Sequence, residues 1–214
     1  MANDTSMRAH ELHPMLIHAP LVMLPAAAAV ELISATASGR IRRRAFSIVG
    51  SKLWWGTAAS GLLAGLAGMA ASQEVEADDH ARDMMFVHGI GNFTLVLAAL
   101  GLATWRTTHR ATMTTGLIGA GAVLAATYTA WLGGEMVYSH GVGVKHRGKT
   151  EASMERNPPL LSARAPGRLA RDAAVGLGWL MRRLVGVARR RDRVQLRPMD
   201  TSPAISEGVF TAPY

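Results

Sequence analysis

The chain has no cysteine among its 214 residues, and this absence removes several kinds of chemistry at once. Disulfide bonds, thiolate catalysis, iron–sulfur clusters and cysteine-type zinc sites are all excluded. The nitrogen and soft ligands that remain are eight histidines and twelve methionines. A metal or cofactor site in this protein would therefore depend on imidazole before any other group.

Signatures of catalysis and of nucleic-acid binding are also missing. There is no Ser/His/Asp arrangement, phosphate-binding loop or nucleotide fingerprint, and Gly141-x-Gly143 is too short and follows no predicted strand. No zinc-finger spacing and no basic stretch interleaved with aromatic residues points to DNA or RNA. We therefore expect no independent catalytic activity and no nucleic-acid partner.

Charged residues are scarce, at 18% of the chain, and they are unevenly placed. Residues 1–144 carry nine Lys/Arg and nine Asp/Glu, whereas residues 145–214 carry fourteen and six. The whole formal net charge of +8 therefore lies in the tail. A neutral apolar body with a basic tail is typical of a protein that meets a membrane surface or an acidic partner.

Long apolar runs, by contrast, are abundant. A run of about 20 residues at ~1.5 Å per residue crosses ~30 Å of hydrocarbon, so each run is a candidate membrane span. The sequence thus predicts an all-α integral membrane protein, a four-helix bundle within residues 1–144 that contacts the lipid bilayer. The predicted spans are about residues 14–36, 46–72, 84–105 and 114–138.

Three prolines mark the first run. Pro14 fits the first turn of a helix, and Pro20 and Pro25 predict a kink further on. A cleaved signal peptide is the alternative for this run, although Glu11 and the prolines are unusual in one.

The tail, residues 145–214, is a basic extension with one helical pattern at about 167–191. Apolar residues recur there at helical spacing, and Arg182 and Arg183 interrupt them. A basic amphipathic helix lying in the plane of anionic lipid headgroups fits this pattern. A solvated or partner-bound helix remains open as the alternative.

The connections between the runs predict the orientation. The segment 38–44 carries four arginines and the third connection carries Arg106 and Arg110, whereas 73–83 is acidic. The positive-inside rule places the two basic connections in the cytoplasm and both termini on the opposite side. The basic tail favours the reverse orientation, but its densest charge lies far from any span.

Five histidines fall near the ends of the predicted spans on one side of the membrane. His18 and His88 each lie about four residues inside a span, so we expect them at equal depth as the axial ligands of a b-type haem. His13 and His140 are the alternative ligands, and Glu135 is a candidate acceptor for an imidazole N–H. His80 lies in the acidic segment nearby.

Three other interpretations use the same residues. His18 and His88 are candidate ligands of a non-haem metal ion, with Glu135 adding oxygen. His18, His88 and Glu135 also fit a proton relay, and a plain polar cluster that fixes helix register needs no ligand at all. Gly61 and Gly65 allow close helix packing or approach of a flat ligand. Glu31, deep in the first span, is expected to pair with arginines of segment 38–44 or with Lys52.

Two motifs carry a resemblance to a known family. The first is His13-Pro14-x-x-x-His18-x-Pro20, and the second runs from Leu132-Gly133-Gly134-Glu135 to His140-Gly141-Val142-Gly143-Val144. With the Gly-rich second run and His88, they resemble the bacterial membrane-protein family called domain of unknown function 2231, over about residues 12–144. Ala19 departs from the aromatic residue expected there.

The resemblance implies a four-span protein of the bacterial inner membrane, related to cytochrome b-like bundles that hold haem between histidines. Together with the histidine pattern it favours an electron-transfer subunit that serves a redox partner. The alternative function is a cofactor-free structural or assembly protein of the membrane.

Overall fold

The computed structural model describes residues 9–75, 77–143 and 163–196, and all regular structure in these ranges is helical, as predicted. The helices are α1 (Ala9–Leu16), α2 (His18–Thr36), α3 (Arg40–Ala71), α4 (Asp79–Thr108), α5 (Met113–Tyr138) and α7 (Ala165–Ala188).

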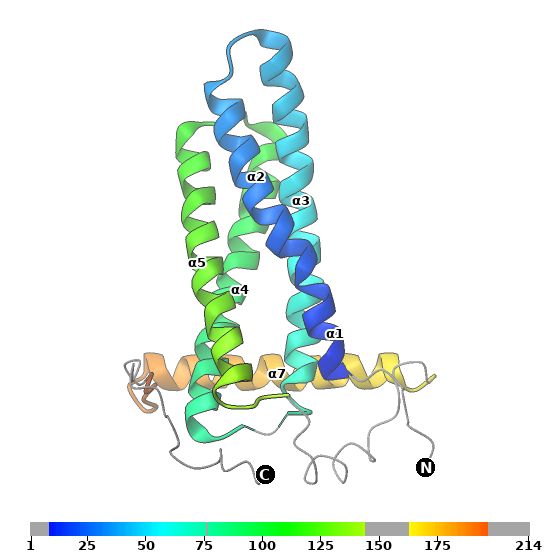
Figure 1. Cartoon of the computed structure of the whole chain (residues 1–214), viewed down its shortest axis with the longest axis vertical. Coiled ribbons are helices and arrows are strands. Elements are labelled where there is room, and N and C mark those ends of the chain that lie inside the picture. Colours follow the sequence, from blue (N-terminus) through cyan, green and yellow to red (C-terminus); the bar gives the residue numbers. More distant parts are fainter. Residues whose placement is uncertain (1–8, 76, 144–162, 197–214) are drawn as a thin grey trace, which may run out of the picture.

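Four long helices pack side by side, with α2 and α4 each lying against both α3 and α5 (Figure 1). Helix α7 runs across the end where α1 and α4 begin and α3 and α5 end, which we call the α7 end (Figure 1). The opposite end, with the short α2–α3 and α4–α5 connections, is the loop end.

Within the described ranges, three segments are long and apolar enough to cross a membrane: Glu11–Thr36, Asp79–Thr108 and Met113–Tyr138. They overlap the first, third and fourth predicted spans. Helix α3 has 32 residues, but its basic start and its glycines lower its hydropathy. It nevertheless turns Leu62, Leu63 and Leu66 outward, each more than 40% exposed. Exposed leucines on one face are more compatible with lipid than with water. This face therefore favours the second predicted span, which remains a prediction.

The first span differs from its prediction at Pro14 and agrees with the kink predicted from its later prolines. Helix α1 begins at Ala9, so Pro14 lies inside it and not in its first turn. The helix breaks at Ile17, between α1 and α2. Pro20 explains this position, because it has no N–H to give to the carbonyl of Leu16, four residues earlier.

The other helices also begin earlier than the apolar runs. Helix α3 starts at Arg40, so the prediction of a loop over 38–44 was wrong and its arginines occupy the first turns. Helix α4 starts at Asp79 because Asp78 caps it, accepting the N–H of Ala81 at 2.7 Å. That hydrogen bond, and then the nearby His140, hold the pKa of the Asp78 carboxyl below its usual range.

Helix α7 lies close to the predicted 167–191 and docks on the acidic end of the molecule. Arg168 reaches Glu74 at 2.5 Å, and Arg183 pairs with Asp83. Between these ion pairs the buried Leu180 packs on Gly89 of α4. Part of the charge of the basic tail is therefore neutralised within the chain.

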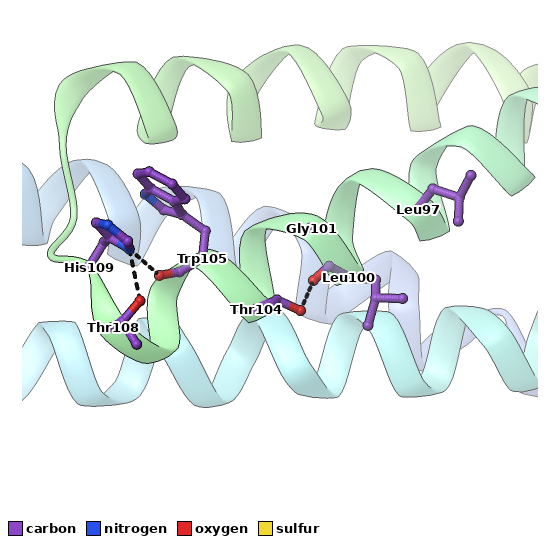
Figure 2. A pocket seen from close by; sticks show the side chains of 7 residues that line it. All are labelled: Leu97, Leu100, Gly101, Thr104, Trp105, Thr108 and His109. Atoms are coloured by element: carbon purple, nitrogen blue, oxygen red, sulfur yellow. Dashed lines mark hydrogen bonds between the residues drawn. The ribbon is translucent and has the colours of Figure 1, made fainter.

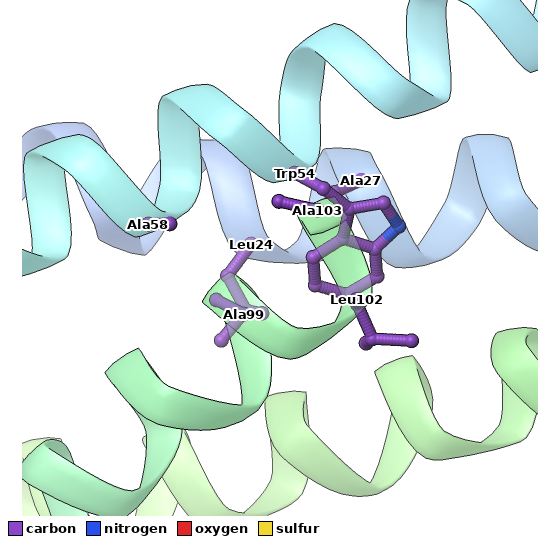
Figure 3. Close-up of a cluster of buried hydrophobic side chains, with 7 residues drawn as sticks. All are labelled: Leu24, Ala27, Trp54, Ala58, Ala99, Leu102 and Ala103. Atoms are coloured by element: carbon purple, nitrogen blue, oxygen red, sulfur yellow. The ribbon is translucent and has the colours of Figure 1, made fainter. Parts of the chain in front are cut away.

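The apolar core is built around one indole. Trp54 of α3 is fully buried, and Figure 3 shows the alanines and leucines of α2, α3 and α4 that surround it. The members of this cluster are Leu24, Ala27, Trp54, Ala58, Ala99, Leu102 and Ala103. Alanines let the helices approach closely enough to enclose a single large ring.

Candidate functional site

Two polar clusters lie among the helices, one toward each end. The cluster at the loop end is centred on Glu31, whose side chain is fully buried. Glu31 lies 2.9 Å from Arg106 of α4 in an ion pair with no exposure on either side chain. It also accepts the Thr115 hydroxyl of α5 at 2.6 Å and the Trp54 indole N–H of α3 at 3.3 Å.

This arrangement corrects the expected partner of Glu31. Neither the arginines of segment 38–44 nor Lys52 pairs with it; the partner is Arg106, which the sequence placed in a loop. The remaining N–H groups of Arg106 bind Ser47 and the carbonyl of His109. Because one carboxylate joins α2, α3, α4 and α5, this cluster is best explained as a structural tie.

The cluster at the α7 end contains two histidine rings in contact. The rings of His13 and His88 meet edge to face, with 6.4 Å between ring centroids and 86° between ring planes. His13 comes from α1 and His88 from α4, so the pair joins two helices that are far apart in sequence.

Backbone carbonyls fix the tautomer of both rings. His13 Nδ1 lies 2.9 Å from the carbonyl oxygen of Ala64, and His88 Nδ1 lies 2.7 Å from that of Thr129. A carbonyl oxygen only accepts, so each Nδ1 carries the proton and donates it. Each neutral ring therefore has its lone pair on Nε2, which is the arrangement that metal-bound histidines use.

A closed polar network surrounds His88. Asn92, one turn further along α4, places its amide nitrogen 3.0 Å from His88 Nε2. The Thr129 hydroxyl donates to the Asn92 carbonyl oxygen at 3.0 Å, and the Thr129 backbone accepts from His88. Both ring nitrogens of His88 thus have partners on α4 and α5.

Two glycines make room for the rings. A Cβ on Gly68 would lie 2.9 Å from His13 Nδ1, and a Cβ on Gly133 would lie 3.2 Å from His88 Cε1. The space that glycine provides on α3 and α5 is thus taken by imidazole. Gly61, by contrast, serves helix packing, because a Cβ there would meet Val96 at 3.1 Å.

The other predicted site residues lie elsewhere. His18 is exposed, and its Nδ1 lies 3.3 Å from the carbonyl of Met15 within the same chain segment. His140 lies beside His80, with 5.0 Å between ring centroids, and 3.5 Å from Asp78. The structure therefore pairs His88 with His13 and not with His18. The carbonyls of Ala64 and Thr129, and not Glu135, accept the Nδ1 protons.

The sequence pattern partly missed this site. Asn92 is the fourth residue after His88, and this spacing predicts that both side chains lie on one face of a helix. Thr129 and the carbonyl of Ala64 carried no signal, because any residue supplies a carbonyl and the sequence does not show which one a ring will reach.

The donor set limits the chemistry of the histidine pair. Among the described residues, no group of three or more His, Asp or Glu side chains is arranged to hold a metal ion. Structural zinc sites take four protein ligands and catalytic ones three, so this pair falls short of both. Two imidazoles are enough only where another molecule supplies the other ligands.

Comparison with known proteins supports the membrane assignment. A family model described as a predicted membrane protein, DUF2231, matches residues 9–146, which include every described helix except α7. The resemblance seen in the two motifs is thereby confirmed. No curated protein and no solved structure matches the chain.

Proposed function

Because this chain belongs to the DUF2231 family of predicted membrane proteins, we propose that it is a bacterial inner-membrane protein that binds a b-type haem between His13 and His88 and transfers electrons to a redox partner. A haem held by two imidazoles supplies one-electron transfer. A relation of this chain to cytochrome b-like bundles is part of the same proposal.

One observation carries the proposal: imidazoles from two different helices lie in ring contact, and a backbone carbonyl holds Nδ1 of each, which leaves the lone pair on Nε2. The rings of His13 and His88 lie 6.4 Å apart between centroids, so both would be within reach of one bound ion after a modest rearrangement of α1. A porphyrin would supply the other nitrogen ligands, so two protein ligands would suffice.

Binding requires two local changes. Asn92 has to release His88 Nε2, which a side-chain rotation accomplishes. Room for the macrocycle has to come from α1, which packs on α3 and α2 and is set off from α2 by the break at Ile17. We propose that α1 moves outward about this break.

The test is a visible spectrum of the full chain purified in detergent from haem-replete cells. We expect a reduced-minus-oxidised Soret and α band that is lost in His13→Ala and in His88→Ala. His18→Ala is the matched control and should keep the band, because that residue is exposed and its Nδ1 lies beside the Met15 carbonyl. A colourless wild-type protein, or a band that depends on His18 and not on His13, contradicts the proposal.

A second candidate function is favoured by the network around His88. Asn92 and Thr129 already form hydrogen bonds with both ring nitrogens of His88. The cluster is therefore also able to hold α4 and α5 together without a cofactor, as in a structural or assembly protein. In that case the protein is colourless, elemental analysis finds no bound metal, and His88→Ala lowers the melting temperature. Bound metal without a haem spectrum would instead favour a non-haem site.

A further inference from the structure

Two adjoining cavities lie at the loop end of α4, remote from the histidine pair. The first, of about 510 Å³, is lined by one face of α4 from Leu97 to His109 (Figure 2). The second, of about 390 Å³, lies between α3 and the end of α4 and includes Lys52 and Arg110. Thr108 and His109 line both cavities, so the two form one continuous surface.

The first cavity is a shallow, open hollow over one face of α4, which we call the groove. Gly101 forms its floor, since a Cβ there would have no atom within 4 Å. Leu97, Leu100 and Trp105 border it and are 52%, 42% and 50% exposed. From Leu97 to Thr108 the groove extends about 16 Å at ~1.5 Å per residue, a length that suits part of an extended acyl chain.

The second cavity is basic and polar. The Lys52 and Arg110 side chains are exposed, and within the described ranges neither has an ion-pair partner. Arg106 also lines this cavity, but its charge is neutralised by Glu31. Ser51 also lines this cavity and adds a hydroxyl group.

The junction of the two cavities has the character of a membrane interface. The Trp105 and His109 rings stack with 3.6 Å between centroids and 7° between planes (Figure 2). Tryptophan is enriched at the level of lipid headgroups, and basic pockets between membrane helices bind anionic headgroups. An apolar groove that leads past such rings to two free cations is complementary to an anionic amphiphile.

We propose that these cavities form one binding site for an anionic phospholipid of the surrounding bilayer. The acyl chain lies over Gly101 along α4, and the phosphate lies between Lys52 and Arg110. The site is independent of the proposed haem, because it lies at the opposite end of the helices.

The test measures thermal unfolding of the full chain in detergent with added lipid. Phosphatidylglycerol should raise the melting temperature more than phosphatidylcholine with the same acyl chains. Inorganic phosphate alone should give no rise, since it lacks the acyl chain. In a titration followed by native mass spectrometry, Lys52→Gln should weaken phosphatidylglycerol binding about 5-fold, and the double variant with Arg110→Gln about 30-fold.

Two further variants separate this site from other basic surfaces. Arg171→Gln with Arg182→Gln on α7 removes the same number of charges at the other end and should leave the affinity unchanged. Gly101→Leu fills the groove and should weaken phosphatidylglycerol and phosphatidylcholine alike. Equal binding of the two lipids by the wild type, a rise with inorganic phosphate alone, or a loss that follows the α7 pair would overturn the proposal.

Discussion

Gly68 and Gly65 lie one turn apart on α3, yet only Gly68 touches the histidine pair. A methyl group on Gly68 would lie 2.9 Å from His13 Nδ1, whereas one on Gly65 meets no atom within 4 Å. We expect Gly68→Ala to displace the His13 ring from the Ala64 carbonyl and to weaken the proposed haem band. The band is measured in the reduced-minus-oxidised spectrum.

Gly65→Ala is the matched control for this prediction. It should keep the spectrum and raise helix stability by about 0.5–1 kcal/mol, because alanine restricts the unfolded chain more than glycine does. If both variants behave alike, His13 does not depend on the space at Gly68.

The buried ion pair of Arg106 and Glu31 leads to a prediction about the effect of a single residue on stability. Arg106→Gln leaves a carboxylate with no exposed surface and no cation beside it. Breaking one partner of a buried pair costs about 3–5 kcal/mol, so the melting temperature in detergent should fall sharply. Arg110→Gln, at an exposed position four residues away, should change it little. Equal effects of the two variants would show that the buried pair contributes no more than a surface charge.

At the scale of elements, the sequence predicted helices well and their ends poorly. Hydropathy located the apolar middle of α3 and α4, but the helices extend into charged segments at Arg40 and Asp79. Capping by Asp78 and Thr112 decides where α4 and α5 begin, and a hydropathy scale does not register a cap. The break at Ile17 agrees with the kink predicted from Pro20, since the carbonyl that loses its donor belongs to Leu16.

The docking of α7 gives the prediction for this scale. Asp83 accepts hydrogen bonds from Arg183 and, at 2.8 Å, from the backbone N–H of Gln195. Asp83→Asn keeps the shape but removes the charge, so α7 should detach more often. We expect faster hydrogen exchange and faster proteolysis over 165–188.

Asp79→Asn serves as the control, since Asp79 is exposed and lies one turn from Asp83. It should leave α7 protected. Equal protection of α7 in the Asp83 variant would mean that Leu180 and its apolar contacts hold the helix alone.

At the scale of the whole molecule, the sequence predicted that the histidines share one end of the helices, but it did not predict which residues each ring contacts. The side follows from counting spans, because antiparallel helices bring the starts of α1 and α4 and the end of α5 together. Which rings meet depends on the rotation of each helix about its axis. The break at Ile17 changes that rotation between His13 and His18, and hydropathy does not determine it.

Orientation is the prediction at this scale. Arg106 is buried against Glu31, so the basic signal at the loop end rests on Arg110 and on the first turns of α3. These still favour a cytoplasmic loop end, with Tyr214 outside. A phosphatase reporter fused after Tyr214 should be active in the periplasm. Activity of a cytoplasmic reporter at that position, with the phosphatase silent, would reverse the orientation.

The ion pairs between α7 and the acidic segment also order events during biosynthesis. Glu74 and Asp83 leave the ribosome 94 and 100 residues before Arg168 and Arg183, their partners. Helices α1 to α5 are therefore complete before either cation exists. A nascent chain stalled before α7 would lack both cations, so the ion pairs of Glu74 and Asp83 with α7 form only after this helix has been translated.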